Sequence, residues 1–222
     1  MKEVGVSGYT IENVSQVQDK EGKWRPIDSD KDPTVILLHY PSILEDTINY
    51  IPPRVKIEIS CLSMDEPTEL RQIRSLIGES FDGEDTDADS LARTVVPTRT
   101  FLEKLFLLAE EFQKEKPRSV RMSRHLYDLA KLMDTEYGVE ALSNRTLYDA
   151  IVEHRKAYYA LKYVNYDLHA PSTINFTIPE SVIGAWQDDY TDMKRFFIYG
   201  ESLEFEALMQ KMKELQERVK IL

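Results

Sequence analysis

The hydrophobic pattern of this chain changes its period at Pro97, and that change limits the fold more than any other feature. Before Pro97, short apolar runs alternate with polar side chains and are separated by prolines, glycines and charged turns, a pattern typical of β-strands. After Pro97, apolar side chains recur every three or four residues, which is typical of amphipathic helices. Because the two patterns occupy separate parts of the sequence, we expect an α+β protein.

Three segments carry the strand signal. Residues 34–40 are apolar and β-branched between two prolines, so they predict a buried strand. Residues 54–60 alternate strictly, with Val55, Ile57 and Ile59 on one face. Residues 66–80 fit a strand or a helix by period alone. We expect these segments to form a partial, mixed or antiparallel sheet.

Five apolar stripes predict five helices after Pro97. The Thr100–Glu103 spacing matches a capping box, and Ser123 and Asn144 are candidate caps of later helices. Pro179 suits the first turn of the next helix, and the last two stripes predict an antiparallel helical hairpin. The chain is thereby divided into a sheet domain, residues 1–96, and a helical domain, residues 97–222. The stripes cover residues 101–112, 126–133, 147–161, 183–197 and 205–222.

Composition narrows the class of protein. The net charge of −11 argues against a surface that holds nucleic acid everywhere. Cys61 is the single cysteine, which excludes intrachain disulfides and cysteine-rich zinc sites. No run approaches the roughly 18 apolar residues of a membrane helix, and the first residues lack the apolar core of a signal peptide. We expect a soluble, cytoplasmic protein.

Standard catalytic motifs are absent from the sequence, which holds no nucleophile elbow, P-loop, His-Glu-x-x-His or dinucleotide-binding glycine turn. Glu58 is a candidate metal ligand, because a carboxylate on a rigid strand can hold a cation. The alternative is an ion pair with Lys56, which lies two residues away on the same face.

The charge changes sign between residues 97 and 131. This segment holds eight basic and five acidic residues, so its net charge is +3 while the rest of the chain carries −14. Such a segment suits a phosphate-binding face, or simply a solvated helix face in which pairs such as Arg124 and Asp128 neutralise each other.

Two runs in this segment resemble the AbiEii/AbiGii toxin family of nucleotidyltransferases. They are Pro97-Thr-Arg-Thr-Phe-Leu-Glu-Lys-Leu-Phe-Leu-Leu-Ala-Glu-Glu-Phe and Arg121-Met-Ser-Arg-His-Leu-Tyr-Asp-Leu. Upstream, residues 54–60 resemble the family strand that bears an acidic residue. The resemblance covers roughly residues 50–222, and it favours a strand at residues 66–80.

The resemblance implies a polymerase-β-like nucleotidyltransferase fold followed by a helical domain. It implies Mg²⁺-dependent transfer of a nucleoside monophosphate, with GTP as the donor and an RNA such as tRNA, or a protein, as the acceptor. It also implies a role in type IV toxin–antitoxin systems or phage defence, with an antitoxin encoded nearby. The implied catalytic residues are Glu58, Lys104 and Asp128, with Glu58 on the metal; the implied substrate-binding residues are Lys104, Arg99, Arg121 and Arg124.

The family's Gly-Gly-x-Ser turn and its Asp-x-Asp strand are not found in the first fifty residues. Residues 5–8 are a weak echo of the turn, and Asp28-Ser29-Asp30 stands in a polar loop. We therefore expect the chain to start after these motifs and to have little transferase activity alone. An exposed sheet edge would then favour a homodimer. The alternative function is a non-catalytic helical module that binds an antitoxin or another protein.

Overall fold

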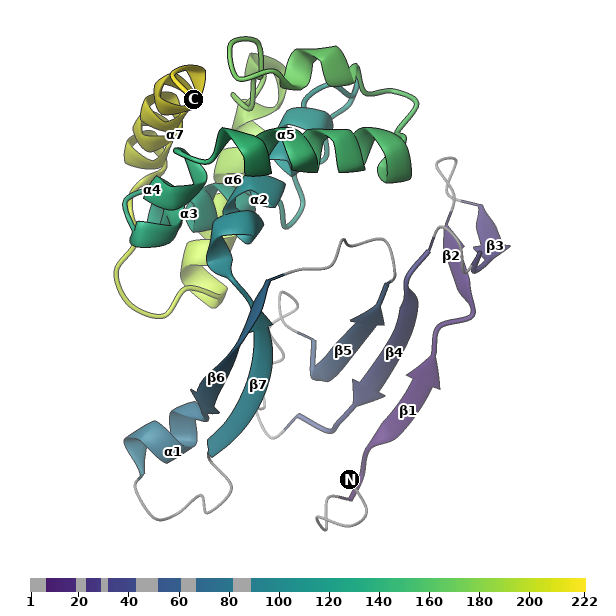
Figure 1. Cartoon of the computed structure of the whole chain (residues 1–222). Helices are drawn as coiled ribbons and strands as arrows, with labels where there is room; N and C mark the ends of the chain where they lie inside the picture. Colours follow the sequence, from purple (N-terminus) through teal and green to yellow (C-terminus); the bar gives the residue numbers. More distant parts are fainter. Residues whose placement is uncertain (1–6, 19–22, 29–31, 43–51, 61–66, 82–88) are drawn as a thin grey trace. The chain divides into compact units, whose positions relative to one another are not determined.

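The computed structural model describes the chain except for residues 1–6, 19–22, 29–31, 43–51, 61–66 and 82–88 (Figure 1). The chain forms two compact units. The first unit comprises Met1–Ser63 with Asp192–Glu201, and the second comprises Met64–Thr191 with Ser202–Leu222. Each unit is described separately.

The first unit holds two antiparallel sheets. In one, β4 (Thr34–His39) lies between β1 (Thr10–Asn13) and β5 (Arg54–Ile59). In the other, β2 (Gln16–Gln18) pairs with β3 (Trp24–Pro26). The strands expected at residues 34–40 and 54–60 are confirmed.

Residues 66–80 begin with a strand and end with a helix, so both readings of their period hold in part. β6 (Thr68–Arg74) pairs antiparallel with β7 (Asp89–Val95). Between them, the short helix α1 (Leu76–Ser80) begins where the Ser75 hydroxyl accepts a hydrogen bond from the Gly78 backbone nitrogen. This hairpin belongs to the second unit.

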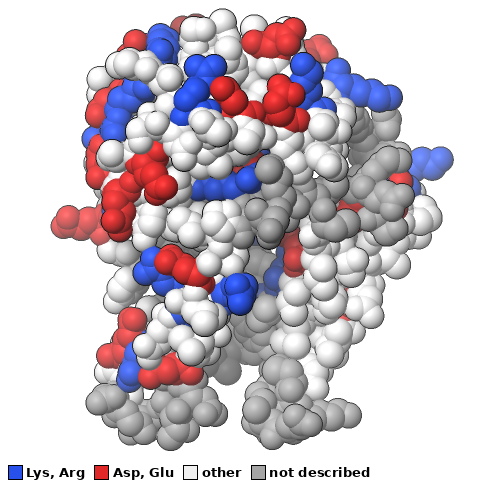
Figure 2. Space-filling model, viewed as in Figure 1, with Lys and Arg blue, Asp and Glu red and all other residues white. Residues whose placement is uncertain are grey.

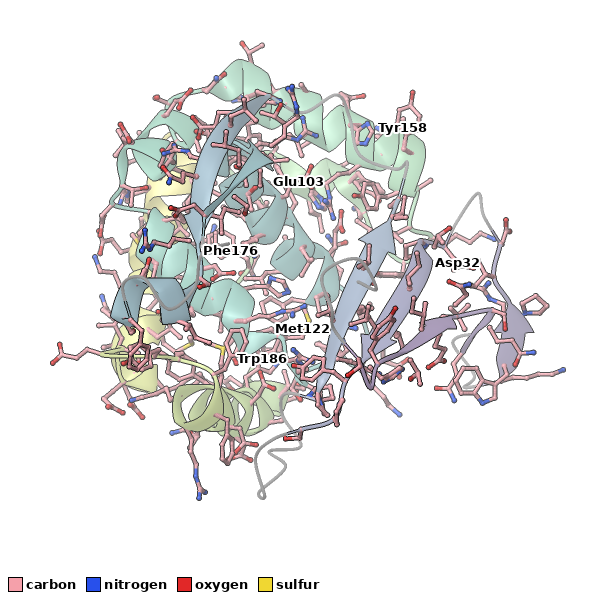
Figure 3. The ribbon with its side chains drawn as sticks, turned by 90° about the horizontal axis from the view of Figure 1, so that it is seen from below. Asp32, Glu103, Met122, Tyr158, Phe176 and Trp186 are labelled. Carbon is pink, nitrogen blue, oxygen red and sulfur yellow. The ribbon has the colours of Figure 1, made fainter. Side chains whose placement is uncertain are left out.

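Helices make up most of the second unit. Two π- or 3₁₀-helical turns, Arg155–Tyr159 and Tyr166–His169, follow α5. Trp186, Phe176 and Met122 are among its fully buried side chains (Figure 3). The helices are α2 (Pro97–Glu111), α3 (Ser123–Leu132), α4 (Glu136–Ala141), α5 (Arg145–His154), α6 (Ile183–Phe196) and α7 (Phe205–Lys220).

The expected α+β class is confirmed, and several helix ends differ from expectation. The capping box at Thr100 is wrong, because α2 begins three residues earlier with Pro97 in its first turn and no side-chain cap at Val96. The cap at Asn144 is confirmed, since its side chain accepts a hydrogen bond from the Leu147 nitrogen at 2.9 Å. The stripe over residues 147–161 overestimates the length of α5, because that helix ends at His154.

Among the residues that the structure describes, no helix is both long and apolar enough to cross a membrane. The sequence echoes of the glycine turn and of the Asp-x-Asp motif lie partly outside the described residues, which leave out residues 5 and 6 of the first and Ser29 and Asp30 of the second.

Candidate functional site

A pocket of about 420 Å³ opens where β7, α2 and α3 meet in the second unit. Two of the sequence-predicted site residues, Lys104 and Asp128, line it. The remaining lining side chains are a lysine, a threonine and three apolar residues: Lys131, Thr100, Val95, Pro97 and Leu132.

Lys104 and Asp128 form an ion pair across two packed helices. The Lys104 Nζ lies 2.7 Å from Asp128 Oδ2, with the lysine side chain 23% exposed and the aspartate 36%. Lys104 stands on α2 between the buried Phe101 and Leu105, so its stem is held by packing while its ammonium reaches the pocket. The structure thus brings together two residues that are 24 positions apart in the sequence.

The start of α3 is fixed by a residue of α6. The Asp189 carboxylate accepts hydrogen bonds from the Arg121 backbone nitrogen at 2.5 Å, the Ser123 nitrogen at 3.0 Å and the Ser123 hydroxyl at 2.5 Å. Arg121 has a left-handed backbone with φ of 58°, which is uncommon for a residue with a side chain. The expectation that Ser123 caps α3 is therefore wrong: Ser123 is already helical, and Asp189 supplies the cap.

The predicted substrate-binding arginines occupy three different environments. Arg124 is exposed on α3, and Arg121 is exposed just before it. Arg99 is buried, with its side chain 4% exposed, and it lies 3.2 Å from the Glu103 carboxylate. None of the three lines the pocket of Lys104 and Asp128. Their role in substrate binding stays a prediction.

His125 adds a neutral, buried neighbour to this cationic region. Burial, together with the smaller effect of the charges of Lys104, Arg124 and Arg118, lowers its pKa to about 4. Its Nδ1 is buried without a hydrogen-bond partner. At neutral pH, His125 is therefore uncharged and adds no positive charge to the pocket region.

Arg155, Glu110 and Glu103 form a buried ionic network that the sequence did not predict. Arg155 is 5% exposed and donates to both Glu110 oxygens, at 2.7 Å and 2.5 Å, and to Glu103. Burial would lower the pKa of Arg155, but the hydrogen bonds and charge of Glu110 outweigh it and hold the pKa above its usual value. Figure 3 shows Glu103 among the side chains of the helical unit.

One sequence signal could have revealed this network. Arg99, Glu103 and Glu110 share the side of α2 that is otherwise filled by Leu102 and Phe106, and acidic residues on an apolar face need buried partners. The partner Arg155 could not be identified from spacing, because it lies 45 residues from Glu110 in the chain.

Glu58 lies in the first unit, and its geometry matches the alternative interpretation. Its Oε1 is 2.7 Å from Lys56 Nζ, and both side chains are about half exposed. Among the described residues, no three His, Cys, Asp or Glu side chains gather closely enough to hold a metal ion.

Charges are interspersed over the visible face of the helical unit (Figure 2). Pairs such as Lys114 with Glu111, at 2.7 Å, neutralise much of the positive segment locally. Part of the positive charge of residues 97–131 is thus compensated within the segment.

Comparison with known proteins gives one family. A family model described as "Nucleotidyl transferase AbiEii toxin, Type IV TA system" matches residues 6–211. No curated protein matches the chain. The match covers most of both units and every residue of the pocket.

Proposed function

Since this chain belongs to the AbiEii family of nucleotidyl transferase toxins from type IV toxin–antitoxin systems, we propose that the pocket of Lys104 and Asp128 binds the phosphates of a nucleoside triphosphate. The observation that supports this function is the 2.7 Å pair of these residues inside a pocket. An ammonium that packing holds in place can bind a phosphate. A carboxylate beside it can accept the proton of the hydroxyl that attacks that phosphate.

Each of the two side chains has a separate task in this proposal. Lys104 offsets the negative charge that develops on the phosphates when pyrophosphate leaves. Asp128 holds the ammonium in place and accepts the proton of the attacking hydroxyl. The apolar side chains Val95, Pro97 and Leu132 form the pocket wall that faces the uncharged part of the ligand.

GTP as the donor, an RNA such as tRNA or a protein as the acceptor, and an antitoxin partner are further parts of the proposal that rest on the family alone. Mg²⁺ is the cofactor that the family implies, although no group of three or more His, Cys, Asp or Glu side chains gathers among the described residues. The GTP-binding and transfer assays are therefore done both with and without Mg²⁺.

The first experiment measures binding of labelled GTP, ATP, CTP and UTP to the full chain. We expect GTP to bind best, and Lys104→Ala to weaken its binding about tenfold or more, because a charge-assisted phosphate contact is lost. Lys156→Ala is the matched control, since Lys156 is exposed on the π-helical turn and does not line the pocket. Equal binding by Lys104→Ala and the unmodified chain would remove the basis of the proposal.

The second experiment tests transfer. We propose that this polypeptide alone moves little or no nucleotide, because the first fifty residues of its sequence hold no Asp-x-Asp in a strand-like pattern. Labelled GTP is incubated with the chain and with bulk RNA or protein acceptors, and label in the acceptor is measured. Robust transfer would contradict the expected inactivity, and its loss in Asp128→Ala would still support the site.

Homodimerisation is the last part of the proposal. Within the described residues, β5 pairs with β4 on one side only, so its other edge is available for a second chain. Light scattering across a range of protein concentrations measures the mass directly. A monomer at every concentration would exclude the dimer without affecting the pocket.

A further inference from the structure

The pocket of Lys104 and Asp128 has one positive charge that no described carboxylate neutralises. Asp128 is engaged with Lys104 at 2.7 Å. Lys131 lines the same pocket, is exposed, and forms no ion pair with any described residue. With two ammonium groups and one carboxylate, the pocket carries a net charge of +1, and that charge belongs to Lys131.

The position of Lys131 follows from the helix. Asp128, Lys131 and Leu132 lie three and four residues apart on α3, so they share the face that borders the pocket. The Lys131 Nζ lies 5.5 Å from the centroid of the Tyr127 ring, one turn earlier on α3. A cation within about 6 Å of an aromatic face is attracted to it. Tyr127 therefore favours side-chain conformations in which Lys131 lies along α3. In these conformations the ammonium can still contact a ligand in the pocket.

Lys131 could have paired with Asp128, because charges three residues apart on a helix attract each other. Asp128 instead faces Lys104 on the neighbouring helix α2. Lys104 is the less exposed cation, and its charge is compensated before any ligand arrives. An incoming anion meets a neutral pair and one uncompensated ammonium.

We infer that Lys131 supplies the charge that first attracts a polyphosphate to this pocket, while Asp128 competes with the ligand for Lys104. The ligand class is a di- or triphosphate, because a pocket with two ammonium groups can contact two phosphate groups at once. This inference rests on the proposed function of the same pocket and assigns a role to a residue outside the sequence-predicted set.

The two parts of the inference predict shifts of opposite sign. Removing the charge of Lys131 weakens binding of a polyphosphate, since the pocket becomes neutral. Removing the charge of Asp128 strengthens binding in the absence of metal, since Lys104 becomes free and the pocket reaches +2. If Lys131 is merely a surface lysine, removing its charge leaves polyphosphate binding unchanged.

The experiment measures calorimetric binding of inorganic pyrophosphate and of GTP to the full chain at low salt in the presence of a chelator. We expect Lys131→Gln to weaken pyrophosphate binding about tenfold, Lys131→Arg to stay within about twofold of the unmodified chain, and Asp128→Asn to tighten binding several-fold. Lys156→Gln is the control and should leave binding unchanged. Urea midpoints of all variants show whether they fold normally.

The outcomes separate this inference from the proposed function. Pyrophosphate binding that is unchanged in Lys131→Gln but lost in Lys104→Gln overturns the role of Lys131 and leaves the pocket intact. GTP binding that is unchanged in Lys104→Gln overturns the proposed function, even if Lys131→Gln weakens pyrophosphate binding and thereby supports the anion role. Failure of the unmodified chain to bind either ligand at millimolar concentration overturns both.

Discussion

The two units bury their apolar residues to very different extents. In the first unit, Val35 and Leu37 are the only buried residues of strands β1 to β5, whereas Ile57 of β5 remains 45% exposed. In the second unit, Leu102 and Leu105 of α2 are fully buried. A buried Leu or Ile side chain contributes about 1.5–3 kcal/mol relative to an exposed one. The helices therefore contain a core of their own, and the described strands contribute little to one.

The charged side chains repeat this contrast. The second unit places Arg155 and Glu110 in its interior, where each needs the other. The ion pairs of the first unit, such as Lys56 with Glu58, lie at the surface, where water competes with the partner. The same kind of pair should thus matter greatly in one unit and hardly at all in the other.

The largest effect is expected when the buried pair is broken. Glu110→Ala leaves the Arg155 guanidinium in the core with Glu103 as its remaining partner, and should lower the free energy of unfolding by about 3–5 kcal/mol. Glu58→Ala, the counterpart on β5, should cost about 0–1 kcal/mol. Urea denaturation followed by circular dichroism measures both. Equal decreases in the free energy of unfolding in the two variants would contradict the expected difference between the units.

Acid should also destabilise the helical unit selectively. Burial lowers the pKa of His125 to about 4 and also lowers the pKa of His169, while an unfolded histidine titrates near 6.5. Between these values the unfolded chain binds more protons, so stability is fully present above pH 6.5 and falls as the pH drops toward 4. For His125 the loss amounts to roughly 2–3 kcal/mol.

Urea midpoints measured from pH 7.5 down to pH 5 follow this titration. His125→Gln should flatten part of the slope even if it lowers stability overall, because it removes the titrating group. His39→Gln replaces a partly exposed histidine of β4 and serves as the control. A slope that is unchanged in His125→Gln would show that this histidine is not responsible.

The smallest effect is expected in the first unit and should remain local. Asp32 accepts hydrogen bonds from the Arg25 guanidinium at 2.5 Å and 2.9 Å and from the Asp28 nitrogen at 2.9 Å. Asp32→Ala should cost about 1 kcal/mol and speed amide hydrogen exchange near β3, leaving α2 and α3 protected. Faster exchange in those helices would show that the two units unfold together.

Periodicity in the sequence predicted those strands and helices that have a clear local pattern of apolar side chains. The strands at residues 34–40 and 54–60, and the helices behind Pro97 and Asn144, follow from local spacing and caps. Helix α4 was missed because Gly138 disfavours a helix. The structure gives the reason for a glycine there: a Cβ at this position would collide with the carbonyl oxygen of Leu132.

The candidate site was only partly accessible from sequence. Lys104 and Asp128 were identified by family motifs, and the structure places them in contact. Lys131 was counted within the positive segment but not singled out, because a sequence does not show which lysine has lost its carboxylate neighbour. The Arg155 network depends on packing between helices that are distant in the chain, which local periodicity does not report.

The cap that Asp189 provides has a consequence for synthesis. The carboxylate that completes the first turn of α3 lies 66 to 68 residues beyond the groups it holds. A ribosome releases α2 and α3, with Lys104, Asp128 and Lys131, well before it adds Asp189. During that interval the nascent polypeptide carries every lining side chain of the pocket, but α3, which bears Asp128, Lys131 and Leu132, begins without the hydrogen bonds that Asp189 supplies. The pocket of Lys104 and Asp128 is therefore completed late in translation, and a chain cut short before α6 would contain its residues without the hydrogen bonds that fix the start of α3.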